Sequence, residues 1–96
     1  MDRKIIIKAI TKIIRKYLSN DYGIFLFGSL AKDKALENSD IDIGILGKEK
    51  IPWEIMTRIL EEVEKIPTLR KIDIVDLNSK EESFRNNVLS YAEVLS

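Results

Sequence analysis

The chain has 96 residues, 45% of them hydrophobic, and its sixteen basic and sixteen acidic residues give a formal net charge of zero. It contains no cysteine and no histidine, which excludes disulfides, thiolate metal sites and histidine general-base catalysis. This length and composition predict one folded domain over residues 1–96. Any chemistry must use carboxylates, hydroxyls, lysines or hard metal ions.

The balanced charge and the apolar pattern restrict the expected partners and location. No excess of basic residues indicates a nucleic-acid partner, so we expect no direct nucleic-acid binding. Lysines interrupt the apolar residues of "MDRKIIIKAITKII", and no run approaches the roughly 20 apolar residues of a membrane span. We therefore expect a cytoplasmic protein without a membrane partner.

The first half of the chain predicts a helix and two strands. Isoleucines recur at three- and four-residue spacing between basic residues, which predicts an amphipathic helix over about residues 3–19. After "SNDYG", the apolar run "IFLF" predicts a short buried strand that ends at Gly28. A brief helix is then expected from Ser29 to about Ala35, followed by a polar loop and by "DIDIGIL", whose alternation is typical of a strand.

A second long helix is expected after the turn "GKEKIP". We expect it to begin near Pro52, whose fixed backbone angle suits a first helical position, and to end at Ile66. Trp53 and Met56 keep helical spacing with other apolar residues of this segment. They are therefore expected in the core rather than as a platform for a nucleobase.

The run "KIDIVDL" predicts a third strand, and the segment 79–95 predicts a last helix that begins with a capping box formed by Ser79 and Glu82. Tyr91, near the end of this helix, is expected either to pack on the domain or to contribute to a partner surface. Helices interleaved with few strands predict a small sheet of about three strands covered by helices, an α/β or α+β fold. The pattern leaves the strand directions open.

Two aspartates, Asp40 and Asp42, stand one residue apart in "DIDIGIL". Side chains alternate along a strand, so these two share one face, about 7 Å apart at the backbone, while the isoleucines face the core. Two carboxylates so close raise each other's pKa unless a cation intervenes. Because Mg²⁺ commonly takes one or two carboxylates together with substrate phosphates, the pair predicts a magnesium site.

A third carboxylate is expected from "KIDIVDL", since a second ion about 3.5–4 Å from the first needs another ligand. Asp73 stands between Ile72 and Ile74, in the same setting as Asp42, so strand parity places it with the acidic pair. Asp76 has the opposite parity and lies at the end of the strand. We expect its side chain to point to solvent.

Gly28 and Ser29 predict a phosphate site beside these acids. A strand that ends at glycine allows the backbone to approach a ligand, and the N–H groups at the start of the following helix can bind phosphate oxygens. The Ser29 hydroxyl would add a hydrogen bond, and Lys32, one turn further on, would add positive charge.

Together these residues resemble a known pattern. Gly28-Ser29, ten intervening residues, the Asp40-Ile41-Asp42 motif and a distant Asp73 resemble the DNA polymerase β-like nucleotidyltransferase superfamily. The chain length and the wording "SDIDIGI" are most similar to its minimal nucleotidyltransferase (MNT) group. The resemblance implies a mixed three-stranded sheet flanked by helices. It also implies transfer of a nucleoside monophosphate from an NTP to a hydroxyl, with release of pyrophosphate.

The resemblance also implies a role for each motif residue. Asp40 and Asp42 would bind both of two Mg²⁺ ions, and Asp73 would ligate the catalytic ion and help to deprotonate the acceptor. Gly28 and Ser29 would hold the β- and γ-phosphates.

Two positions depart from the family pattern. Many relatives have an arginine directly after Gly-Ser and a glycine a few residues later, where this chain has Leu30 and Asp33. An acidic Asp33 would weaken triphosphate binding if it turned inward, and Lys32 stands where a basic residue is common.

MNT chains are commonly paired with a small helical HEPN protein, an RNase-like toxin, and act as antitoxins by adding AMP to a tyrosine on it. The resemblance therefore implies an ATP- and Mg²⁺-dependent adenylyltransferase with a HEPN-type toxin as partner. Two alternatives stay open. One is a binding module that neutralises its partner by contact alone, which Leu30 and Asp33 favour. The other is an antibiotic-type transferase for small molecules, whose acceptor cleft would need a homo-oligomer or another subunit.

Overall fold

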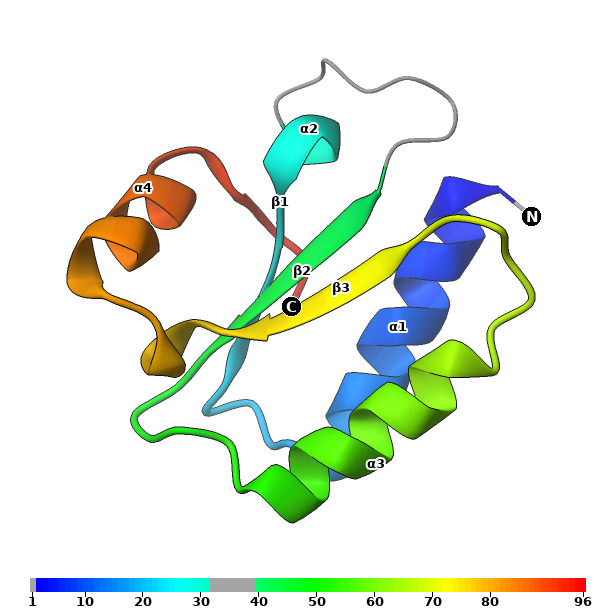
Figure 1. The fold of residues 1–96 in the computed structure, drawn as a ribbon, viewed down its shortest axis with the longest axis horizontal. Helices are drawn as coiled ribbons and strands as arrows, with labels where there is room; N and C mark the ends of the chain where they lie inside the picture. Colours follow the sequence, from blue (N-terminus) through cyan, green and yellow to red (C-terminus); the bar gives the residue numbers. More distant parts are fainter. Residues whose placement is uncertain (1, 32–39) are drawn as a thin grey trace.

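The computed structural model describes residues 2–31 and 40–96. The elements follow one another along the chain as shown in Figure 1. They are α1 (Arg3–Tyr17), β1 (Gly23–Phe27), α2 (Gly28–Ala31), β2 (Ile41–Leu46), α3 (Trp53–Glu64), β3 (Ile72–Asp76), the 3₁₀ helix η1 (Leu77–Ser79), α4 (Glu82–Tyr91) and β4 (Glu93–Val94).

The strands form a mixed sheet in the order β3-β2-β1-β4. β1 pairs antiparallel with β2 and with β4, whereas β2 and β3 run parallel. The predicted α/β or α+β class and the mixed sheet flanked by helices are thereby confirmed. The expected number of strands was one too low, because β4 was assigned to the last helix.

The last helix ends earlier than predicted. Ala92, the residue after α4, has an extended backbone (φ −64°, ψ 147°), so the chain leaves the helix and pairs with β1. The Leu95 amide donates to the Ile24 carbonyl at 2.8 Å, and the Ile24 amide donates to the Ser96 carbonyl at 3.0 Å. These hydrogen bonds satisfy groups along the edge of β1 that a helix over residues 79–95 would have left without a strand partner.

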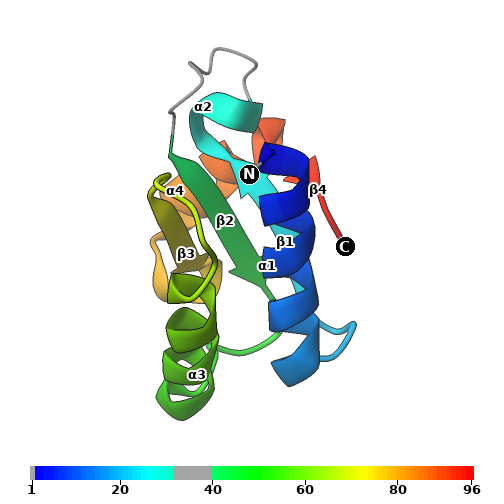
Figure 2. The same cartoon turned by 90° about the vertical axis from the view of Figure 1, so that its right-hand side faces the viewer.

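The two faces of the sheet carry different layers. α1 and α3 lie together on one face, whereas α4 lies on the other (Figure 2). The larger core lies between the sheet and the first two helices, and its fully buried members are all isoleucines: Ile6, Ile10, Ile14, Ile24, Ile41, Ile43, Ile45 and Ile59. A smaller core of Phe27, Leu77 and Val88 lies on the α4 side. Strand alternation therefore sends the isoleucines of β2 to one layer and leaves Asp42 on the other.

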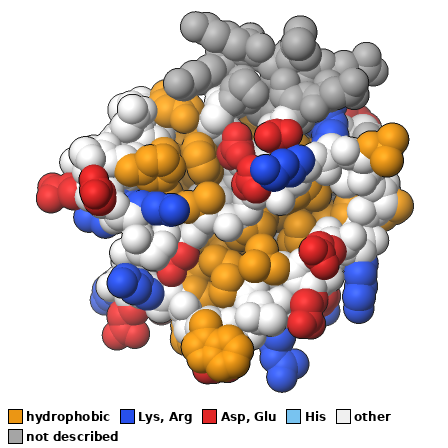
Figure 3. All heavy atoms as spheres, viewed as in Figure 1, with side chains coloured by type: hydrophobic (Ala, Val, Ile, Leu, Met, Phe, Trp, Pro, Cys, Tyr) orange, Lys and Arg blue, Asp and Glu red, His pale blue; other side chains and the backbone are white. Residues whose placement is uncertain are grey.

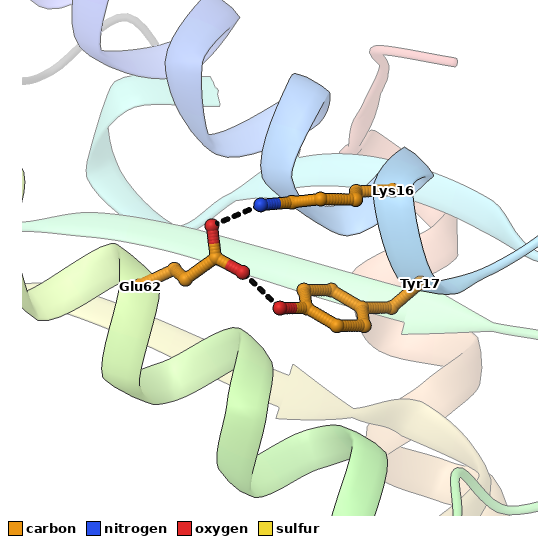
Figure 4. A network of polar contacts seen from close by, with 3 residues as sticks. All are labelled: Lys16, Tyr17 and Glu62. Atoms are coloured by element: carbon orange, nitrogen blue, oxygen red, sulfur yellow. Dashed lines mark hydrogen bonds and ion pairs between the residues drawn. The ribbon is translucent and has the colours of Figure 1, made fainter.

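A polar contact joins the two helices of the larger layer (Figure 4). The Lys16 ammonium donates to Glu62 Oε1 at 2.6 Å, and the Tyr17 hydroxyl donates to Glu62 Oε2. The hydrogen bond from Lys16, followed by that from Tyr17, lowers the pKa of the Glu62 carboxyl below its ordinary value of 4.5.

Three local predictions were wrong. Trp53 is 74% exposed and lies outside the core, although Met56 packs partly buried against it. Ser79 forms no capping box: it belongs to η1, where its hydroxyl donates to the Asp76 carbonyl at 2.7 Å, and α4 begins without a side-chain cap. Asp76 does not simply point to solvent, because its carboxylate accepts from the amides of Ile51 (2.8 Å) and Asn78 (3.0 Å). It thereby ties the end of β3 to the segment before α3.

Within the part of the chain that the structure describes, no helix combines the length and the apolar character that crossing a membrane requires.

Replacing Glu62 with glutamine should weaken the link between α1 and α3. We expect a decrease in melting temperature of at most about 4 °C near pH 7, since exposed ion pairs contribute little to stability. Because the pKa of Glu62 is lowered in the fold, its contribution is present above 4.5 and is lost as the pH falls through the lowered pKa. Circular-dichroism melts near pH 7 and at about pH 3 measure this. Glu61→Gln, at an exposed position on the same helix, is the matched control. Equal melting temperatures of wild type and Glu62→Gln near pH 7 would contradict the prediction.

Candidate active site

Asp42 and Asp73 lie side by side on neighbouring parallel strands. The register pairs Asp42 of β2 with Asp73 of β3, between the pairs Ile41 with Ile72 and Ile43 with Ile74. Residues in register on parallel strands project to the same face, so the two carboxylates are neighbours on the face opposite the isoleucines. The structure therefore brings together two of the three predicted acids. Asp40 is exposed and directly precedes β2.

The charge of this pair is incompletely compensated. Burial raises the pKa of the Asp42 carboxyl above its ordinary 3.8, and the negative charges of Asp73 and Asp40 raise it further. Lys71 opposes this effect, but its ammonium is 4.0 Å from Asp73 Oδ2 and largely exposed. Acidic and basic side chains meet in one small area on the face seen in Figure 3. An additional cation would relieve the repulsion that Lys71 leaves.

Gly28 makes room for the Asp42 carboxylate. Gly28 follows Phe27, the β1 residue that pairs with Asp42, and has a positive φ of 73°. A Cβ atom built at Gly28 would lie 2.1 Å from Asp42 Oδ2. Both the left-handed backbone and the close carboxylate require glycine here. The sequence predicted a glycine that allows a ligand to approach; the structure adds that the same glycine accommodates an acidic side chain of the site.

Tyr91 reaches the site from α4. Its hydroxyl oxygen accepts a hydrogen bond from the Gly28 amide at 3.1 Å, and its ring packs against the smaller core. Of the two expectations for Tyr91, packing on the domain is confirmed. The contact with Gly28 had no signal in the sequence, because 63 residues separate the two.

The remaining predicted phosphate ligands are only partly placed. Ser29 belongs to α2, which begins at Gly28, one residue earlier than predicted. Lys32 and Asp33 lie outside the described residues. The roles predicted for Ser29 and Lys32 in phosphate binding therefore stay predictions.

The acidic pair fits a hard divalent cation. Among residues 2–31 and 40–96, no three acidic side chains already form a closed metal-binding cluster. Mg²⁺ does not need one, since it usually keeps several waters and combines one or two carboxylates with substrate phosphates. Asp42 and Asp73 supply hard oxygen ligands whose mutual repulsion a cation would remove. Metal binding by these two residues and by Asp40 stays a prediction.

Comparison with known proteins agrees with this geometry. The sequence pattern of the family described as "Polymerase beta, Nucleotidyltransferase" matches residues 8–96. The chain belongs to this nucleotidyltransferase family. The resemblance inferred from Gly28-Ser29, Asp40, Asp42 and Asp73 is confirmed, and the match covers every residue of that motif.

Several relatives of this nucleotidyltransferase are known. A Haemophilus influenzae protein named as a probable protein adenylyltransferase, MntA, is 32% identical over 77 residues, which cover 80% of this chain and 68% of MntA. A chain in a toxin–antitoxin crystal structure with AMP-PNP is 26% identical, with a TM-score of 0.68 over 93% of this chain and 71% of that one. A chain in the Shewanella oneidensis complex of a tri-AMPylated HEPN toxin with an MNT antitoxin is 22% identical, with a TM-score of 0.66 over 99% and 72% of the two chains. At this last identity the similarity shows the fold alone.

Asp42→Asn should stabilise the metal-free nucleotidyltransferase near pH 7. The substitution removes one of two like charges on adjacent strands, and we expect a gain of up to about 1 kcal/mol, or up to about 8 °C in melting temperature. Because the pKa of Asp42 is raised in the fold, the wild type loses stability as the pH rises from 3.8 through the raised value. The two proteins should therefore melt alike at about pH 3.

Thermal melts in EDTA and in Mg²⁺ measure this effect. Mg²⁺ should raise the melting temperature of the wild type more than that of Asp42→Asn. A ligand stabilises the folded state in proportion to how tightly it binds, and the variant lacks one of the two carboxylates that would bind the ion. A variant less stable than wild type in EDTA near pH 7 would contradict the repulsive character of the pair.

Gly28→Ala should destabilise the fold through two separable effects. A left-handed alanine costs about 1–2 kcal/mol, and its methyl group would in addition collide with Asp42 Oδ2. A double-mutant cycle with Asp42→Ala separates the two, since removal of the carboxylate relieves the collision but not the backbone strain. Denaturant unfolding of the four proteins gives the coupling. Strict additivity would show that Gly28 and Asp42 are not in contact.

Proposed function

We propose that this chain is an antitoxin that transfers AMP from ATP to a hydroxyl, a tyrosine hydroxyl, of a partner HEPN toxin. The observation that carries the proposal is the pairing of Asp42 with Asp73 next to the Gly28 turn. Two similarities support it: the relative MntA is named as a protein adenylyltransferase, and a related toxin–antitoxin complex was crystallised with the ATP analogue AMP-PNP.

The proposed reaction is a displacement at the α-phosphorus of ATP. The acceptor oxygen forms a bond to this phosphorus, the bond to the β-phosphate oxygen breaks, and pyrophosphate leaves. Asp42 and Asp73, with Asp40, would hold two Mg²⁺ ions. When bound, these ions supply charge neutralisation on the attacking and leaving oxygens.

The chain's own residues position the reactants in this proposal. The turn of Gly28 and Ser29, at the end of β1 and one strand away from Asp42, receives the β- and γ-phosphates. Since the Gly28 N–H donates to Tyr91, Gly28 contributes the bend of the backbone and Ser29 contributes the hydrogen-bond donors in this proposal. Asp73 lies on the far side of Asp42 from β1, at the outer strand of the sheet, and would accept the proton of the acceptor hydroxyl. This order across the sheet separates the leaving pyrophosphate from the incoming hydroxyl.

Incubation of the purified chain with labelled ATP, Mg²⁺ and a purified HEPN partner tests the proposal. We expect label on the partner with wild type and none in EDTA. Asp42→Asn and Asp73→Asn should each reduce the rate more than about 100-fold, because loss of residues that merely support metal ligands already costs 10–100-fold. Asp21→Asn is the matched control: Asp21 is exposed and lies before Gly23, at the opposite end of β1 from Gly28.

Mapping the label by mass spectrometry decides the acceptor. Label on a tyrosine of the partner is the expected result. Neutralisation of the partner without any labelling by the wild type would overturn the proposal in favour of inhibition by contact alone.

A further inference from the structure

The Gly28 amide is held by a tyrosine of the last helix. Gly28 is the first residue of α2, so its N–H has no partner within that short helix. It donates instead to the Tyr91 hydroxyl oxygen at 3.1 Å. Tyr91 is the last residue of α4.

Asp42 lies close to the same glycine. Asp42 Oδ2 lies 2.1 Å from the position that a Cβ atom of Gly28 would take, and the backbone of Gly28 has a φ of 73°. The acidic site and the Tyr91 hydroxyl therefore meet at one residue. A movement of the Gly28 peptide would disturb both contacts.

Tyr91 is itself held in place. Its ring packs with the smaller core, in which Val88, one turn earlier on α4, is 2% exposed. Directly after Tyr91, the Ala92 amide donates to the Val88 carbonyl at 2.9 Å, and β4 then pairs with β1 through Glu93 and Leu26. The chain is anchored on both sides of Tyr91, so the hydroxyl is a preset acceptor rather than a mobile one.

We infer that Tyr91 is a positioning residue for nucleotide binding, which acts through Gly28. Its hydroxyl holds the Gly28 peptide, and with it the Gly28-Ser29 turn, where the proposed function places the β- and γ-phosphates. The inference rests on that proposed function for its ligand, but the contact itself does not. Since the phosphates bind before chemistry, loss of the hydroxyl affects the affinity for ATP more than the chemical step.

Tyr91→Phe removes the hydroxyl and keeps the ring. We expect the Kd for Mg²⁺-ATP, measured by calorimetry, and the KM for ATP to rise about 10-fold, with kcat little changed. Tyr22→Phe is the matched control, because the Tyr22 ring lies against Gly47, beyond the end of β2 that is remote from Asp42. It should leave the Kd unchanged.

Val88→Ala separates the hydroxyl from the packing of the core. This variant loosens the core around Tyr91 and lowers the melting temperature, but it keeps the hydroxyl and its hydrogen bond to Gly28, so the Kd should rise clearly less than in Tyr91→Phe. If Val88→Ala weakens ATP binding as much as Tyr91→Phe, packing rather than the hydrogen bond is responsible, and the inference is overturned.

Amide hydrogen exchange of Gly28, followed by NMR without nucleotide, tests the contact independently of the proposed function. The Gly28 amide should exchange faster in Tyr91→Phe than in wild type or Tyr22→Phe. Unchanged exchange overturns the inference. If wild type binds no ATP while the exchange responds as expected, the proposed function fails and the role of Tyr91 in holding the turn stands.

Discussion

The register of β2 against β3 is the constraint on which the site depends. On one face of this strand pair, Ile41, Ile43 and Ile45 are fully buried. Burial of each isoleucine contributes about 1.5–3 kcal/mol, whereas like charges in register oppose pairing by less than about 1 kcal/mol. The apolar face therefore dominates, and Asp42 is held next to Asp73 despite the repulsion. A slip by one residue would place the carboxylates in the core, so that change of register does not relieve them.

The second constraint is that the site is assembled from distant parts of the chain. β1 delivers Gly28, the parallel pair delivers the carboxylates, and the last ten-residue helix delivers Tyr91. β4 then pairs with the other edge of β1. Through Tyr91, the residues after Asp76 thus support the Gly28 turn from the face opposite α1 and α3, and the site is complete only when both layers are packed on the sheet.

The sequence predicted the placement of the acidic residues better than the contacts that hold the site together. The reason is physical. Strand alternation and the Ile-Asp-Ile settings are local patterns, so the shared face of Asp42 and Asp73 followed from parity alone. The hydrogen bond from Gly28 to Tyr91 and the pairing of β4 are long-range contacts without a local signal. The spacing of Tyr91 with Val94 and Leu95 suits a helix, but hydrogen bonds to the open edge of β1 determine an extended chain instead. Trp53 follows the helical period of α3 and is still exposed to solvent. Periodicity predicts which face of a helix is apolar, but it does not predict how much of that face the neighbouring elements cover.

The separation of layers also determines how stability and ligand binding are related. The larger core and the contact of Glu62 with Lys16 and Tyr17 stabilise the fold on the face remote from the acids. The unfavourable charge lies on the other face, where burial and the negative charges of Asp73 and Asp40 raise the pKa of the Asp42 carboxyl. A ligand that neutralises this charge binds the folded state and not the unfolded chain, so part of its binding energy appears as folding stability. Repulsion between the carboxylates thus weakens the free protein and would strengthen the binding of a cation, because the isoleucines on the opposite face keep the acids in place with or without a ligand.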